Sequence, residues 1–331
     1  MTCVVLKCGV SPDSGAARGL DAALAGLAAT VLELSAVPTR KELKQLDAFA
    51  KEILPEDPTP SLDEIAAQPD VRHLGAPEIA PQKPHLKEAL RVVVIGSDAA
   101  LSAVLTRMMR GDYLWAEVGY APVDAASTAA RNWGLPSDVE SALSVALNAS
   151  VMPVPLIRND AGLAVAGSAT ISEWENTEIT GEIIVDDHVL VRHGAPVDQM
   201  SGNASKKSGN ARSRSGQAGP GTYGARLVPM VDAPGIVAAK AISPVVESAA
   251  IGLEENTQGG HGGFLRGGFF ARWRTPVAPG QLDVQSVCTG RAVQAGGPSL
   301  RVIVDGVSAK RPVKRVTFYR HLRDLQIARA S

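Results

Sequence analysis

The sequence predicts an N-terminal α/β domain built on a parallel sheet, followed by a β-rich domain. In the first half, short β-branched runs are each followed by a turn and a helical pattern. In the second half, short apolar runs alternate with Gly, Asn, Asp and Pro, which is typical of antiparallel strands. Only 4% of the 331 residues are aromatic. With abundant Ala, Val and Gly, this composition favours close-packed α/β layers, and the length favours two domains.

The clearest pattern in the first half begins at residue 92. Residues 92–95 form a short, unbroken β-branched run, as expected for a strand buried on both faces of a parallel sheet. Gly96, Ser97 and Asp98 follow as a turn and a helix start, and apolar residues then recur at helical spacing. Because a helix N-terminus favours anions, this loop is a candidate anion site.

A second unit repeats this order about two dozen residues later. The strand-like residues 118–122 lead into a polar loop at residues 123–128. A short helical pattern follows over residues 129–133, and Gly134 and Pro136 are expected to end it. Two consecutive strand-loop-helix units of this kind resemble the loops of a nucleotide-binding site.

These two loops resemble those of diacylglycerol kinases and related lipid kinases. In that family the first strand ends in Gly-Gly-Asp-Gly-Thr, and this chain has Gly96-Ser97-Asp98-Ala99-Ala100. The second family loop reads Pro-Leu-Gly-Thr-Gly-Asn-Asp-Phe-Ala-Arg. Residues 122–131 have the same length and likewise begin with Pro and end with Ala-Arg, but they contain none of its glycines.

Two weaker matches lie near the ends of the chain. Residues 11–15, Ser-Pro-Asp-Ser-Gly, are similar to the Asn-Pro-x-Ser-Gly turn that follows the first strand of the family, and a helix is expected over residues 16–27. Asp305-Gly306-Val307 stands where the family has an Asp-Gly-Glu turn with acidic catalytic residues. Asp-Gly is also a common hairpin turn, so Asp305 has two interpretations.

The resemblance implies a fold, a reaction and a set of site residues. The second domain would be a β-sandwich, with substrate bound between the domains. The reaction would be transfer of the γ-phosphoryl group of ATP to a lipid hydroxyl, with Mg²⁺ bridging the phosphates and Asp305 as the base. The residues implied beside the nucleotide are Gly96, Ser97, Asp98, Ala125, Ser127 and Thr128.

The loss of the loop glycines favours a second hypothesis, a catalytically inactive relative that binds lipid or an anionic partner. Glycine lets backbone N–H groups approach a phosphate, and Ala99 and Ala100 restrict that approach. Asp124 replaces a glycine and brings a carboxylate towards a polyanion, which is unfavourable by about 4 kcal/mol at ~4 Å and an effective dielectric constant of ~20. Asp98 and Asp124 are therefore remnants of a lost site, metal-associated groups, or helix caps.

Charge is distributed unevenly along the chain. Residues 201–331 contain 18 Lys and Arg against 7 Asp and Glu, although the whole chain carries a formal net charge of −1. A basic half suits an anionic partner such as a bilayer surface, a nucleotide or a nucleic acid, or it compensates the acidic half of the same molecule. The sequence leaves a homodimer open.

Metal, disulfide and membrane-span signals are weak. The odd number of cysteines, Cys3, Cys8 and Cys288, argues against a disulfide framework, and the scattered histidines predict no metal site. No window approaches ~18 consecutive apolar residues. Residues 1–10 also lack the pattern of a signal peptide. We therefore expect a cytoplasmic protein that reaches a lipid at the membrane surface without a transmembrane segment.

The organisation of the two domains follows from these patterns. Residues 1–150 are assigned to the α/β domain, and residues 313–331 return to it if the chain follows the family. Residues 151–312 form the β-rich domain. A Pro-rich insertion at residues 55–90 is expected to be an extended linker, with partner binding as the alternative.

Two Gly-rich basic segments interrupt the β-rich domain. The loop 201–226 lacks large apolar residues and is predicted to be disordered. The segment 259–274 contains one Arg-Gly-Gly with nearby phenylalanines. A hairpin explains it best, membrane contact is the lipid-kinase interpretation, and stacking on RNA is the weakest of the three.

Overall fold

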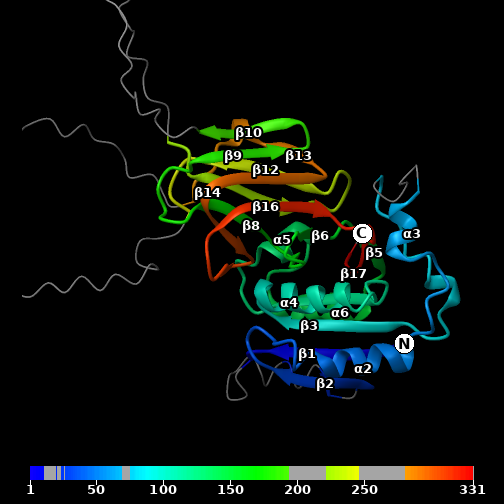
Figure 1. Ribbon diagram of the computed structural model, residues 1–331. Coiled ribbons are helices and arrows are strands. Elements are labelled where there is room, and N and C mark those ends of the chain that lie inside the picture. Colours follow the sequence, from blue (N-terminus) through cyan, green and yellow to red (C-terminus); the bar gives the residue numbers. More distant parts are fainter. Residues whose placement is uncertain are drawn as a thin grey trace, which may run out of the picture.

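The computed structural model describes residues 1–10, 20, 24–25, 27–68, 75–193, 221–245 and 280–330, which form two sheets (Figure 1). The first sheet has six strands in the order β2-β1-β3-β4-β17-β5. Five of them are parallel, and β5 pairs antiparallel with β17. The strands are β1 (Thr2–Cys8), β2 (Ala29–Leu34), β3 (Leu90–Gly96), β4 (Glu117–Pro122), β5 (Val151–Val154) and β17 (Leu325–Ala328).

Helices cover both faces of this sheet. The helices that pack on it are α2 (Lys44–Ile53), α4 (Asp98–Arg110), α5 (Thr128–Trp133) and α6 (Val139–Asn148). The other described helices are α3 (Leu62–Ala66) and the 3-10 helices at Lys83–His85 and Val284–Ser286, the last of which lies against β12 of the second sheet. Val92 and Val94 of β3 pack into the core that α2, α4 and α5 share, whereas Val93 and Ile95 pack into the core of α6. The β-branched run is therefore buried on both faces, as predicted.

The second sheet is antiparallel and has eleven strands among the described residues. Its longest strand, β14 (Ala292–Val304), pairs with β9 in its first half and β8 in its second, with a register shift between Gly296 and Leu300. The sheet thus folds over one core instead of forming two separate sheets. The other strands are β6 (Ile157–Asn159), β7 (Ala164–Val165), β8 (Ala169–Glu173), β9 (Gly181–Val185), β10 (His188–His193), β11 (Gly224–Pro229), β12 (Ile236–Ala241), β13 (Cys288–Gly290), β15 (Val307–Ser308) and β16 (Val313–Arg320).

The predicted α/β and β-rich parts are confirmed, with local corrections. β11 begins at Gly224, so the end of the loop 201–226 is ordered as strand. Residues 284–287 are one of the short apolar runs that the sequence predicts to be strands, but residues 284–286 form a 3-10 helix. The turn at 11–15, most of the helix at 16–27, residues 201–220 and the segment 259–274 lie outside the described residues.

The chain changes sheets at positions close to the predicted domain boundaries. β5 still belongs to the first sheet, β16 belongs to the second, and β17 returns to the first between β4 and β5. The boundaries at 150 and 312 remain predictions. Among the described residues, no helix is long and apolar enough to cross a membrane.

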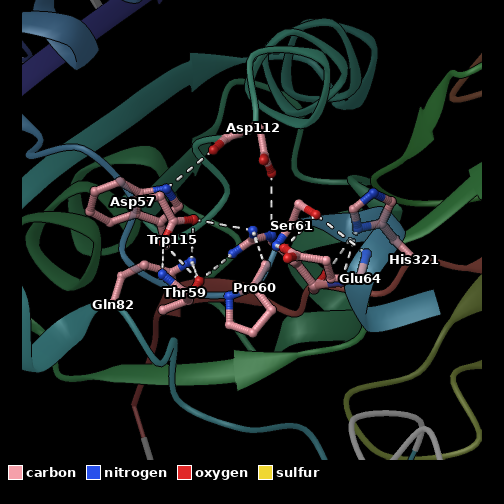
Figure 2. Close-up of polar contacts among 10 residues, drawn as sticks. Asp57, Thr59, Pro60, Ser61, Glu64, Gln82, Asp112, Trp115 and His321 are labelled. Carbon is pink, nitrogen blue, oxygen red and sulfur yellow. Dashed lines mark hydrogen bonds and ion pairs between the residues drawn. The ribbon is translucent and has the colours of Figure 1, made fainter. Parts of the chain in front are cut away.

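The Pro-rich insertion is packed against the first domain, so its prediction as an extended linker was wrong. Arg323, which is buried, forms ion pairs with Asp57 at 3.1 Å and with Asp112 at 3.2 Å. The amide of Gln82 donates to Asp57 and to Thr59 (Figure 2). These partners are distant in sequence, and proline content alone could not reveal them.

Candidate functional site

A cavity of about 670 Å³ lies where the carboxyl ends of β3 and β4 face the second sheet, and we call it the polar cavity. Ligands commonly bind beyond the carboxyl ends of parallel strands in open α/β sheets. The polar cavity is lined by Ser97, Asp98, Ala99, Asp124, Ala126, Ser127, Thr128, Ser168, Thr170, Arg226, Ala241, Val245, Gly280, Leu282, Ile303, Asp305 and Gly306.

The fold brings most of the predicted site residues to this cavity. The lining contains five of the seven: Ser97, Asp98, Ser127, Thr128 and Asp305. The other two do not line it. Gly96 is buried at the end of β3, where its carbonyl oxygen accepts a hydrogen bond from the Tyr120 hydroxyl at 3.1 Å, and Ala125 is exposed.

Helix α4 is capped by Ser97 rather than by Asp98. The Ser97 hydroxyl oxygen accepts a hydrogen bond from the Ala100 N–H at 3.2 Å, in the usual geometry of a serine cap. Asp98 is the first residue of α4, and its carboxylate points to the loop that follows β4. The interpretation of Asp98 as a helix cap was therefore correct, but the helix that its carboxylate caps is α5 and not α4.

The Asp98 carboxylate connects the loop after β3 to the loop after β4 by hydrogen bonds. Its Oδ1 accepts hydrogen bonds from the hydroxyls of Tyr120 at 2.9 Å and Ser127 at 2.5 Å. Its Oδ2 accepts from the N–H groups of Thr128 at 2.8 Å and Ala129 at 3.2 Å, at the start of α5. A carboxylate offers about four lone-pair sites, and these four donors occupy them.

Asp305 lies in the opposite wall of the cavity, at a strained turn. Its backbone has a φ of 49°, in the left-handed region. The carboxylate accepts hydrogen bonds from the N–H groups of Ala166, Gly167 and Ser168 at 2.7–2.8 Å. Burial raises the pKa of Asp305 to about 7; the three N–H donors act in the opposite direction, and the charge of Asp98 adds to the rise.

Two residues that sequence reasoning missed complete the contact between the domains. The guanidinium of Arg226 donates to the hydroxyl oxygens of Thr128 at 3.3 Å and Ser168 at 3.1 Å. Gly167 approaches so closely that a Cβ there would lie 2.6 Å from Oδ2 of Asp98. Arg226 was hidden at the end of a segment predicted to be disordered, and no sequence signal distinguishes Gly167 from an ordinary turn glycine.

The residues of the polar cavity fit Mg²⁺ and ATP poorly. Asp98 has no remaining lone pair for a metal, and one oxygen of Asp124 accepts from the Ala126 N–H. Among the described residues, no group of three or more His, Cys, Asp or Glu side chains could hold a metal ion. The Cβ atoms of Ala99 and Ala126 also stand where the related loops have glycine.

A smaller cavity of about 280 Å³ adjoins the polar cavity, and we call it the side groove. Thr128, Arg226 and Leu282 line both. Apart from these shared residues, the side groove is formed by the aliphatic residues Val228, Val237, Ala239 and Val287 together with Arg131 and Asn132. A ligand that spans both cavities would therefore meet polar groups at one end and an apolar surface at the other.

Comparison with known proteins identifies the fold. No model of a known family matches the sequence, and no curated protein matches it. A diacylglycerol kinase from Bacillus anthracis strain Sterne has a similar crystal structure, with a TM-score of 0.52 over 99% of this chain and 97% of that chain, at 8% sequence identity. The chain has the diacylglycerol kinase fold.

Two other solved structures extend this comparison. A putative diacylglycerol kinase from the same strain aligns with a TM-score of 0.50 and 8% identity over 99% of this chain and 97% of that one. An NAD kinase from Archaeoglobus fulgidus in complex with ATP covers 99% of this chain and 94% of its own, but its TM-score of 0.37 at 11% identity is too low to support an argument. Identities this low establish the fold and leave the activity open.

Proposed function

We propose that this protein binds a hydroxyl-bearing lipid in the polar cavity and does not transfer phosphate to it. The supporting observation is the bonding of Asp98. Its carboxylate occupies the two N–H groups at the start of α5, which a phosphate held by this loop would need. Because the same carboxylate has no free lone pair, it is also a poor metal ligand.

The charges in the polar cavity favour a neutral head group over a nucleotide. Its described lining has three carboxylates, Asp98, Asp124 and Asp305, and one guanidinium, that of Arg226. A polyanion close to these carboxylates would be repelled by about 4 kcal/mol per charge pair at ~4 Å and an effective dielectric constant of ~20. A hydroxyl can donate to a carboxylate and accept from a guanidinium, so an alcohol or glycerol head group suits the lining.

The side groove supplies the apolar surface that a lipid needs. It begins at residues that also line the polar cavity, and its strand residues Val228 and Val237 are aliphatic. A lipid hydroxyl in the polar cavity would place the adjoining carbon chain over this groove. The solved structures with this fold are named as kinases of diacylglycerol, a neutral lipid with one free hydroxyl.

Phosphoryl transfer from ATP to such a lipid is the second candidate, and Asp305 favours it. Burial raises the pKa of Asp305 to about 7, a value suited to a general base near neutral pH. Asp305 is among the residues that line the polar cavity, where a base for the lipid hydroxyl must lie. In that case the nucleotide would bind to groups other than the N–H groups that Asp98 occupies.

The two candidates are separated by measuring binding and transfer on the same protein. Binding of dioctanoylglycerol is followed by calorimetry for the unmodified protein, for Val237→Trp and for the control Val189→Trp. Both substitutions place tryptophan on an accessible strand position, but only Val237 lines the side groove. Transfer is followed with labelled ATP, Mg²⁺ and the same lipid in mixed micelles, with Asp305→Asn as the control.

The proposal predicts binding that Val237→Trp weakens at least tenfold and that Val189→Trp leaves unchanged, with no labelled lipid above the Asp305→Asn background. If labelled lipid forms and its formation requires Asp305, the proposal is rejected and the protein is a lipid kinase. Failure of the unmodified protein to bind the lipid would reject both.

A further inference from the structure

A third cavity, of about 340 Å³, is lined by residues of α4 and of the second sheet, and we call it the apolar cavity. Ala99 lines both it and the polar cavity, but successive residues of β14 face different cavities: Val302 and Val304 line the apolar one, and Ile303 lines the polar one. β14 therefore separates the two, and nothing in the proposed function uses the apolar cavity.

Aliphatic side chains form most of the surface of the apolar cavity. On α4 the small side chains of Ala99 and Ala103 leave the space open. The Ser102 hydroxyl donates to the Ala164 carbonyl at 2.6 Å, and the Thr106 hydroxyl oxygen accepts from the Ala164 N–H at 2.9 Å. The aliphatic residues of the facing strands and turns are Leu163, Val302, Val304, Val307, Val313 and Val316.

Aliphatic side chains also remain in water at the mouth of this cavity. Val37, Leu163 and Val307 are 45%, 40% and 51% exposed, and they come from three separate parts of the chain. Exposed aliphatic residues are ordinary when scattered, but a group around a cavity mouth indicates a binding surface. The volume lies near the lower end of the ~300–1,000 Å³ range of ligand pockets, which suits one chain rather than two.

Arginines surround this mouth, and the side chains of two of them have no partner among the residues that the structure describes. Arg107 is paired with Asp47, and Arg110 donates to the carbonyls of residues 161 and 162. Arg40 and Arg315 are exposed, and neither side chain forms a hydrogen bond or ion pair with any described residue. The lining holds a single carboxylate, that of Asp160.

The region beyond the mouth is basic as well. Lys310, Arg311 and Lys314 are exposed in and beside the turn that leads into β16. Together with Arg315, they make up four of the eleven Lys and Arg residues that the structure describes in the basic half.

We propose that the apolar cavity binds one acyl chain and that Arg40 and Arg315 hold its anionic head group, a carboxylate or a phosphate monoester. The chain would lie against α4 and β14, and the head group would remain at the surface between the two arginines. A fatty acid and a lysophosphatidate share this chemistry. The site goes beyond the proposed function, because it takes an anion and lies on the other side of β14 from the polar cavity.

A fluorescent fatty acid, dansyl-undecanoic acid, tests this proposal directly. The probe is titrated into the full-length protein below its micellar concentration, and laurate, lauroyl-lysophosphatidate and dodecanol then compete for it. The charge variants are Arg40→Glu and Arg315→Glu, with Lys314→Glu as the matched control. Lys314 has the same charge and lies on the same strand, but it does not line the cavity. Ala103→Trp fills the cavity from α4.

We expect saturable binding that each arginine reversal weakens about fivefold, in line with ion pairs at exposed sites, and that Lys314→Glu changes less than twofold. Ala103→Trp should abolish binding. Displacement by laurate or by lauroyl-lysophosphatidate supports the site, and the stronger competitor identifies the source of the head group. Equal competition by neutral dodecanol, or equal effects of Lys314→Glu and Arg315→Glu, would overturn the proposal. Because the charge variants alter only exposed residues, the test does not depend on the folding of Ala103→Trp.

Discussion

Replacing Asp98 with alanine should destabilise the protein strongly. Its carboxylate accepts four hydrogen bonds, and three of the donors would lose their partner: the Ser127 hydroxyl and the N–H groups of Thr128 and Ala129. The Tyr120 hydroxyl would keep the carbonyl of residue 96. With ~1.5–3 kcal/mol for each bond to a charged group, reduced where water can replace the carboxylate, the expected loss is about 3–5 kcal/mol.

Urea denaturation of Asp98→Ala measures this loss, and Asp124→Ala is the matched control. Asp124 lines the same cavity, but it is exposed and accepts one turn hydrogen bond, so its removal should change stability by less than about 1 kcal/mol. Residues kept for ligand chemistry are commonly strained, and their removal is often neutral or stabilising. Unchanged or increased stability of Asp98→Ala would therefore refute the structural role assigned to this carboxylate.

Three further predictions concern stability, each measured by urea denaturation. The raised pKa of Asp305 means that the native state keeps a proton that the unfolded chain releases between pH 3.8 and about 7, so the contribution of Asp305 to stability falls as pH rises. Asp305→Asn should accordingly cost more at pH 5 than at pH 8, and the opposite trend would contradict the raised pKa. Gly119→Ala should cost about 1–3 kcal/mol because its Cβ would lie 2.6 Å from the Ala146 carbonyl oxygen, whereas Gly296→Ala meets nothing and should be nearly neutral; equal effects would contradict this packing. Arg323→Leu should cost about 1–3 kcal/mol because it removes a buried guanidinium from two partly exposed carboxylates that water can then solvate, and no measurable loss would mean that the Pro-rich insertion is held by other contacts.

The fold was predictable because its central elements carry local signals. The run at 92–95 is β-branched, and such a run is typical of a strand that is covered on both sides. Gly134 was predicted to end the short helical pattern that begins at residue 129, and α5 does end at Trp133, with Gly134 at a φ of 68°. The order of these elements, compared with the diacylglycerol kinase pattern, was enough to indicate the architecture.

The bonding within the site was not predictable, because it depends on contacts between distant residues. Asp98 stands thirty residues from Thr128, and nothing in the sequence states which of its possible partners it meets. Arg226 is brought to Thr128 and Ser168 by the pairing of β11 with β8, which sequence patterns do not fix. The Pro-rich insertion was misjudged for the same reason, since its main partner, Arg323, lies near the other end of the chain.

The central claim is that this diacylglycerol kinase fold binds a lipid without using ATP, and the most direct measurement is the thermal stability of the protein with millimolar Mg²⁺-ATP. A ligand at ~100 times its Kd stabilises the native state by about 2.7 kcal/mol, which raises the melting temperature measurably. Our account predicts no shift with Mg²⁺-ATP and a clear increase with dioctanoylglycerol. A clear increase with Mg²⁺-ATP would contradict it, because it would mean that the nucleotide binds despite the donors that Asp98 occupies.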